Sequence, residues 1–172
     1  TQRLQVHDKS TALIFSEPGK HLDMIRKKYW ARGQNCPLAV TCGGHPIFVC
    51  VGGMGLPWGM PEYDWLGWWM KEPVKVIKGP TTGLPIPADS EIVLEGEMVP
   101  PELESRIEGP FSEWTGHYSP ARPEPAFKVN CILHRNDPII LAVLPFLGRG
   151  AVSQHTGRQV IKAAKVWSAL DK

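Results

Sequence analysis

Two glutamates, five positions apart, form the most informative pattern in this sequence. They belong to the segment Glu108-Gly-Pro-Phe-Ser-Glu113-Trp-Thr-Gly-His117-Tyr118. Gly109 and Pro110 do not continue a helix, so the segment is predicted to be an ordered loop or the start of a strand. Such a loop can direct both carboxylates into one small volume, which suits proton transfer, metal binding or pairing with an arginine. The alternative is a surface turn with two solvated acids, because acids and turn residues often occur together.

Arg3 is a candidate partner for these acids, and it begins a predicted strand. If Arg3 pairs with Glu108 across a pocket, it keeps that carboxylate ionised while Glu113 titrates. Two acids with unlike partners take different pKa values, so one glutamate would orient and the other would act as acid or base. An exposed surface charge is the simpler interpretation of Arg3.

A histidine and a glutamate, each expected in the first turn of a helix, form a candidate cation site. The helix N-terminus beside His21 carries partial positive charge, which keeps the imidazole neutral, as a metal ligand must be. The same helix end suits a phosphate, helped by Lys20. Glu62 would join His21 on a hard divalent cation such as Mn²⁺ or Mg²⁺. The alternatives are a histidine that faces water and an acid that only complements a helix dipole.

A glycine-rich segment, Gly52-Gly-Met-Gly-Leu-Pro-Trp-Gly59, directly precedes Glu62. It lacks side chains at several positions, so its carbonyl groups can contact a second cation or a flat ring. It matches neither of the common glycine-rich nucleotide-binding patterns. Most of the seven tryptophans lie in or near this Gly/Pro-rich middle, where they fit either a core or the walls around a flat cofactor or substrate.

The elements that must position these residues are predicted from hydrophobic periodicity and turn residues. Strands are predicted at 4–6, 11–15, 37–42, 74–78, 91–97, 127–134 and 139–144, and helices from Ser16 to a stop at Gly33, from Pro61 to about Met70 and from Ser153 to Leu170. The run 47–51 fits either a short helix or a strand. Hairpin-type connections predict an α+β fold with a mostly antiparallel barrel or sandwich.

Composition excludes several classes of protein. The chain has 172 residues, which fits one domain, and its net charge of +2 is too small to indicate nucleic-acid or membrane-surface binding. The longest apolar run, 138–146, is too short to span a bilayer. The four cysteines match no zinc-module spacing and are expected to be free thiols in a reducing cytoplasm. Because the chain starts at Thr1 in a strand-like pattern, we expect it to be a piece of a longer protein.

Taken together, these segments resemble the UbiD family of prenylated-FMN-dependent decarboxylases. Arg3-Leu-Gln-Val resembles the family's Y-R-x-Q-V strand, and Lys20-His21 resembles the start of the helix with its metal-binding histidine. The run from Gly52 to Glu62 is similar to the cofactor loop and its metal-binding glutamate. Pro85-Ile-Pro-Ala-Asp-Ser-Glu-Ile-Val-Leu-Glu-Gly96 and the segment from Glu108 resemble the patterns V-P-A-x-x-E-I-V-L-E-G and E-G-P-[FY]-G-[ED]-x-x-G-Y.

The resemblance implies a fold and a set of site residues. Residues 1–172 would form a single domain, the central cofactor-binding domain of a longer chain, built as a flavin-binding split β-barrel with flanking helices. The implied catalytic network is Arg3, Glu108 and Glu113. The implied cofactor contacts are Lys20, His21, Gly52, Gly53, Met54 and Glu62, with His21 and Glu62 on a divalent metal, usually manganese, and the carbonyls of Val51 and Met54 on potassium.

The resemblance also implies an activity. An aromatic or α,β-unsaturated carboxylic acid, an aryl-CoA thioester among the options, would attach covalently to prenylated FMN. CO₂ would then leave, and Glu113 would deliver a proton, in a reaction that is reversible. Family members usually assemble into dimers or hexamers, so a homo-oligomer is expected, with a small-molecule acid as the partner and neither nucleic acid nor membrane.

The sequence departs from the family pattern in several places. The family's third metal ligand, an asparagine, would precede Thr1, so the metal site is incomplete in this chain. Ser112 stands where the family has glycine, and His117 precedes Tyr118 where Gly-Tyr is frequent. Two other functions stay open on the residues alone. One is a non-catalytic domain for flavin binding or assembly, and the other is a hydrolase that uses Glu108 and Glu113 as its acid pair.

Overall fold

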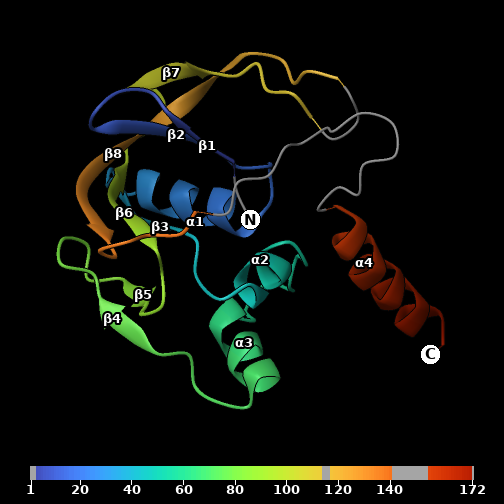
Figure 1. Cartoon of the computed structure of the whole chain (residues 1–172). Coiled ribbons are helices and arrows are strands. Elements are labelled where there is room, and N and C mark those ends of the chain that lie inside the picture. Colours follow the sequence, from blue (N-terminus) through green and yellow to red (C-terminus); the bar gives the residue numbers. More distant parts are fainter. Residues whose placement is uncertain (1–2, 114–116, 141–154, 172) are drawn as a thin grey trace.

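The structure is a computed structural model that describes residues 3–113, 117–140 and 155–171. In chain order, its elements are β1 (Arg3–Val6), β2 (Thr11–Phe15), α1 (His21–Trp30), β3 (Cys36–Cys42), α2 (Ile47–Gly52), α3 (Glu62–Met70), β4 (Val76–Lys78), β5 (Pro85–Pro87), β6 (Ile92–Met98), β7 (Ser105–Glu108), β8 (Arg122–His134) and α4 (His155–Leu170). Figure 1 shows how they are arranged.

The main sheet is antiparallel throughout. Its strands lie in the order β1-β2-β8-β6-β3, with β7 paired to β8, and β4 and β5 form a separate two-stranded sheet. The predicted α+β class with mostly antiparallel strands is therefore confirmed. Among the described residues, β1 and β3 at the two ends of this order do not pair with each other, so hydrogen bonding does not close the sheet into a barrel.

The core forms where α1 lies against the sheet (Figure 1). Ala12, Ile14, Met98 and Phe127 are almost completely buried there, and Leu22, Tyr29 and Trp30 of α1 pack against them. Phe127 belongs to β8, which pairs with β2, β6 and β7 along its length. This core therefore fixes the β1–β2 hairpin and the β7–β8 pair relative to α1.

The start of α1 differs from the prediction. We expected the helix to open at Ser16, but it begins at His21, with Lys20 as the N-terminal cap residue. Gly19 has φ 78°, a left-handed conformation that glycine adopts without steric cost, and its N–H donates to Oδ2 of the buried Asp23 at 3.0 Å. Asp23 thus fixes the turn that leads into His21.

A second small core supports the glycine-rich segment. Val51, Leu56 and Leu66 are buried together, which joins α2, the loop after it and α3. The run 47–51, which periodicity left open, is helical in α2. The predicted second helix is confirmed as α3, which begins at Glu62.

Several strand boundaries were wrong, mostly beside prolines. β4 begins at Val76 rather than at 74, and β5 and β7 were not predicted. β8 begins at Arg122, five residues before the predicted start at Phe127, because Pro123 and Pro125 argued against a strand. Ile139 and Ile140 are not in a strand, and the rest of the strand predicted at 139–144 lies outside the described residues. The last helix is confirmed from His155, and its predicted start at Ser153 also lies outside them.

The V-L-E-G motif contributes a structural carboxylate. Glu95 on β6 is completely buried and accepts hydrogen bonds from the backbone N–H of Thr82 at 2.6 Å and from its hydroxyl at 2.5 Å. Burial raises the pKa of Glu95, but the hydrogen bonds from Thr82 and Thr81 lower it by more. The motif therefore connects the loop after β4 to the main sheet. No helix among the described residues is long and apolar enough to cross a membrane.

Candidate active site

Arg3 connects the two glutamates of the segment 108–118. Its Nε and Nη2 donate to the two carboxylate oxygens of Glu108 at 2.5 and 3.0 Å, and its Nη1 donates to Oε1 of Glu113 at 2.5 Å. The Glu108 side chain has no exposed surface, whereas 38% of the Glu113 side chain is exposed. Arg3 therefore connects a buried carboxylate to one that solvent or a ligand can reach.

Two cross-strand pairs explain this geometry. Arg3 lies opposite Phe15 in the β1–β2 hairpin, and Glu108 lies opposite Arg122 in the β7–β8 pair. Directly opposed residues of antiparallel strands project to the same face. The Arg3 guanidinium carbon lies 5.3 Å from the centre of the Phe15 ring and 4.7 Å from that of Phe111, so aromatic faces also help to position the cation.

The segment after Glu108 is a loop held by hydrogen bonds, in agreement with the predicted ordered loop. Gly109 has φ 82° and precedes a cis peptide bond to Pro110, and its N–H donates to Oε1 of Gln5 on β1 at 2.9 Å. Glu113 N–H donates to the carbonyl of His117 at 2.8 Å. The backbone of Glu113 is thus held at a fixed place beside Arg3.

His21 and Glu62, the first residues of α1 and α3, lie side by side. Nδ1 of His21 is 3.6 Å from Oε1 of Glu62, and their side chains are 30% and 46% exposed. The ring of Trp58, from the glycine-rich segment, packs edge-on against the imidazole at 5.2 Å between ring centres. Two helix N-termini meet here, and both favour a negatively charged ligand.

The donor atoms of this pair fit a divalent cation. An imidazole nitrogen and a carboxylate oxygen 3.6 Å apart can both lie about 2.1 Å from a single ion. Within the described ranges, no three His, Cys, Asp or Glu side chains form a group that could hold a metal. His21 and Glu62 are thus two residues that could hold such an ion.

The other predicted contact residues lie in two places. Lys20, at the start of α1, is exposed and lies 3.8 Å from Glu17. Gly52 ends α2, and Gly53 is its C-terminal cap residue. The carbonyl of the buried Val51 accepts the N–H of Met54 at 2.9 Å. The predicted potassium-binding carbonyls of Val51 and Met54 therefore come from one tight turn, and the binding of potassium itself stays a prediction.

Comparison with known proteins now places the chain. A family model described as UbiD, 3-octaprenyl-4-hydroxybenzoate carboxy-lyase Rift-related domain, matches residues 1–147. The chain belongs to the UbiD family. It is 36% identical over 139 residues to the pyrrole-2-carboxylic acid decarboxylase of Pseudomonas aeruginosa, which covers 80% of this chain and 28% of that protein. It is 34% identical over 137 residues to a phenolic acid decarboxylase of Bacillus subtilis, again 80% of this chain and 28% of the relative.

Solved UbiD structures share the fold. The UbiD-class enzyme HmfF of Pelotomaculum thermopropionicum, in complex with FMN, superposes with a TM-score of 0.75 at 29% identity, over 81% of this chain and 31% of that one. The vanillic acid decarboxylase of Sedimentibacter hydroxybenzoicus, in its closed form, gives a TM-score of 0.75 at 30% identity, over 81% and 29%. This chain thus spans less than a third of the length of these UbiD proteins.

Three tryptophans in and just after the glycine-rich segment of this UbiD chain are exposed. Trp58, Trp68 and Trp69 are 51%, 63% and 56% exposed. Trp65 is partly buried against the second core and stacks on Trp69, with 5.0 Å between ring centres. Of the two alternatives given by the sequence, core packing is therefore wrong for Trp58, Trp68 and Trp69.

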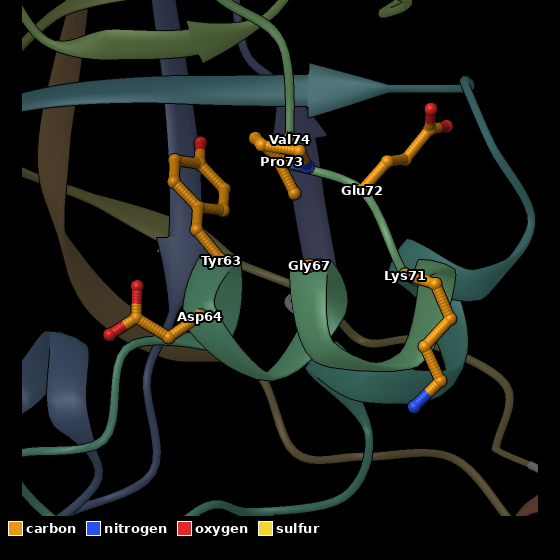
Figure 2. Close-up of a pocket in the computed structure, with 7 residues that line it drawn as sticks. All are labelled: Tyr63, Asp64, Gly67, Lys71, Glu72, Pro73 and Val74. Atoms are coloured by element: carbon orange, nitrogen blue, oxygen red, sulfur yellow. The ribbon is translucent and has the colours of Figure 1, made fainter.

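A hollow of about 600 Å³ lies beside α3 but does not involve the predicted UbiD site residues. Its walls are Tyr63, Asp64, Gly67, Lys71, Glu72, Pro73 and Val74. Figure 2 shows the side chains of Asp64, Lys71 and Glu72 pointing in different directions. Because no polar groups converge in it, the hollow does not define a ligand site.

Sequence reasoning missed Arg122 and Glu124 beside the Arg3 network. Nε of Arg122 lies 3.2 Å from Oε1 of Glu124 and 3.7 Å from Oε2 of Glu108. Burial raises the pKa of Glu124, although the nearby guanidinium of Arg122 opposes this rise. The alternation Arg122-Pro-Glu124-Pro was a signal, since residues two apart in a strand share one face. This alternation is hard to recognise as a strand because Pro123 and Pro125 occupy the positions in between.

Proposed function

We propose that this chain is the central, prenylated-FMN-binding domain of a longer UbiD-class enzyme. That enzyme removes CO₂ reversibly from an aromatic or α,β-unsaturated carboxylic acid. The proposal rests on one observation: the Arg3 guanidinium donates hydrogen bonds both to the buried Glu108 and to the accessible Glu113. Named relatives support the substrate class, because they act on pyrrole-2-carboxylic and phenolic acids.

The two glutamates would have different roles. Glu108 uses both oxygens on Arg3 and has no exposed surface, so it orients the guanidinium. Glu113 receives one hydrogen bond from Arg3, and its partly exposed carboxyl is the group that can transfer a proton to the substrate carbon. A hydrolase acid pair fits less well, because Glu108 has no exposed surface and uses both oxygens on Arg3, whereas both acids of a glycosidase must reach the substrate.

The cofactor would be held at the meeting point of α1 and α3. His21 and Glu62 supply nitrogen and oxygen ligands for Mn²⁺, and the cation with Lys20 would bind the phosphate of the cofactor. Gly52 and Gly53 allow a ring to approach the backbone, and the carbonyls of Val51 and Met54 would bind K⁺. When bound, prenylated FMN supplies the electron sink that decarboxylation needs.

Three further features belong to the same proposal. The main sheet would correspond to the split barrel of the family. The whole chain would act as one domain of a cytoplasmic enzyme. Full-length copies would assemble into a dimer or hexamer. A solved structure of an evolved dimeric form of HmfF in complex with prFMN supports the proposed cofactor and the proposed assembly into oligomers.

The full-length protein, purified from cells that make prenylated FMN, tests this proposal. We expect flavin absorbance, bound manganese and CO₂ release from a panel of aromatic and unsaturated carboxylic acids. Flavin binding with no turnover or hydrogen exchange on any acid would favour a non-catalytic domain. A colourless protein that hydrolyses glycosides would refute the proposal.

A further inference from the structure

Arg122 lies against the same residues that position Arg3. It is the cross-strand partner of Glu108, and its guanidinium carbon lies 3.6 Å from the centre of the Phe15 ring, whose own cross-strand partner is Arg3. β1, β2, β7 and the start of β8 gather at one end of the molecule in Figure 1. Two guanidinium groups therefore share one aromatic ring and one buried carboxylate.

Arg122 brings a second positive charge to this cluster of acids. Arg3 alone faces two carboxylates, and Glu108 is one that solvent does not reach. A buried carboxylate is costly unless cations and hydrogen bonds compensate it. Arg122 adds the second positive charge, 3.7 Å from the Glu108 oxygen that also accepts Nη2 of Arg3.

Glu124 is the third acid of the cluster, and its Oε1 lies 3.2 Å from Nε of Arg122. Its carboxyl is 7% exposed, and burial raises its pKa, with the charge of Glu108 adding to the rise while Arg122, Arg26 and Arg3 oppose it. Nε of Arg122 is buried and has no hydrogen bond, although both carboxylates lie within ion-pair distance. Nε of Arg122 therefore lies between Glu124 and Glu108, within ion-pair distance of both and without a hydrogen bond to either.

We infer that Arg122 is a positioning residue for proton transfer by the Arg3 network. It compensates the charge of Glu108 and rests on Phe15, so that Nη1 of Arg3 stays directed at Glu113. Without Arg122, Arg3 becomes the sole cation for both acids and is drawn toward the buried one. Glu113 then loses its fixed donor. This inference rests on the proposed function of the network.

The test is Arg122→Gln in the full-length enzyme loaded with prenylated FMN and manganese. We expect kcat to fall about 10-fold or more, with KM and the flavin spectrum little changed, because binding groups elsewhere are intact. Loss of a nearby positive charge also raises the pKa of carboxyl groups, so the pH–rate profile shifts to higher pH. Arg122→Lys keeps the charge but loses the flat contact with Phe15, and we expect it to restore the pH profile and part of kcat.

Arg106→Gln is the matched control, because Arg106 is an exposed arginine on the neighbouring strand, paired with Glu104. We expect it to keep full activity and an unshifted profile. If Arg122→Gln behaves like Arg106→Gln while the wild type is active, the role of Arg122 is wrong and the proposed function stands. If the wild type itself shows no turnover, the proposed function fails instead. Should Arg122→Gln not fold, Arg122→Lys decides: a kcat below that of Arg106→Gln, with KM and the pH profile unchanged, would support the inference, and a kcat equal to that of Arg106→Gln would refute it.

Discussion

Arg3 forms a two-point ion pair with Glu108, a carboxylate with no exposed surface in the structure. Removing Arg3 would take both hydrogen bonds from the buried Glu108 carboxylate and leave it with the more distant Arg122, which is expected to cost up to about 3–5 kcal/mol of stability. A substitution at this pair would therefore change both the stability of the fold and the activity, and the two effects could not be separated. Glu113, which lies at the accessible side of Arg3, allows a cleaner test.

Glu113→Gln is expected to abolish proton delivery and to leave the cofactor bound. The amide keeps the shape of the side chain and a carbonyl oxygen for Arg3, but it has no transferable proton. General acids contribute about 10²–10⁴-fold, so kcat should fall within that range. Steady-state rates and flavin absorbance of the full-length enzyme check this. Glu102→Gln, in an exposed turn before β7, is the control; equal activity in both variants would remove Glu113 from the mechanism.

His21→Ala is expected to release metal and cofactor together. The variant lacks one of the two proposed ligands, whose Nδ1 and Oε1 atoms lie 3.6 Å apart at the starts of α1 and α3. Metal analysis and flavin absorbance on the purified full-length protein measure both losses. His7→Ala, in the exposed turn of the first hairpin, should keep both. Cofactor retained at wild-type occupancy in His21→Ala would exclude His21 from the site.

Asp23→Asn is expected to cost about 2 kcal/mol of unfolding free energy at pH 7. Burial opposes the charge of Asp23, but hydrogen bonds from Lys27, the Gly19 backbone and Arg26 outweigh it and lower the pKa from 3.8 to about 2. A lowered folded-state pKa means that this stability is present above about pH 3.8 and is lost as the pH falls toward 2.

Urea unfolding of the chain at pH 7 and pH 3 checks this dependence. The difference between wild type and Asp23→Asn should narrow at the lower pH. Asp64→Asn is the control, because Asp64 is exposed on the first turn of α3 and should cost less than about 1 kcal/mol. A difference that stays constant with pH would show that the charge of Asp23 does not stabilise the fold.

Thiol modification should distinguish the cysteines. All four, which lie within the described residues, are free; Cys50 is exposed and Cys36 is buried. Burial raises the pKa of the Cys36 thiol to about 11 and also raises that of Cys42. Because the thiolate is the reactive form, iodoacetamide followed by peptide mass spectrometry should label Cys50 first and Cys36 only after unfolding. Early labelling of Cys36 would contradict the packing of β3.

Local sequence patterns were enough to predict those elements whose conformation depends mainly on neighbouring residues in the chain. The hairpin of β1 and β2, the start of α3 at Glu62 and the turn after Glu108 follow from alternation, helix signals and Gly-Pro. β8 was predicted short because prolines usually interrupt strands, yet its first four residues pair with β7, which is itself only four residues long. That pairing depends on a partner strand rather than on the local sequence.

The residue types of the candidate site could likewise be predicted from the sequence. The contacts among these residues were decided by the tertiary structure. Residue types and a family resemblance singled out Arg3, Glu108 and Glu113. Only the sheet, which brings together residues more than 100 positions apart, shows that one guanidinium serves both acids. Arg122 became visible only through its register with Glu108 and its contact with Phe15. Charge balance in a buried cluster depends on distances in space, and sequence patterns report only distances along the chain.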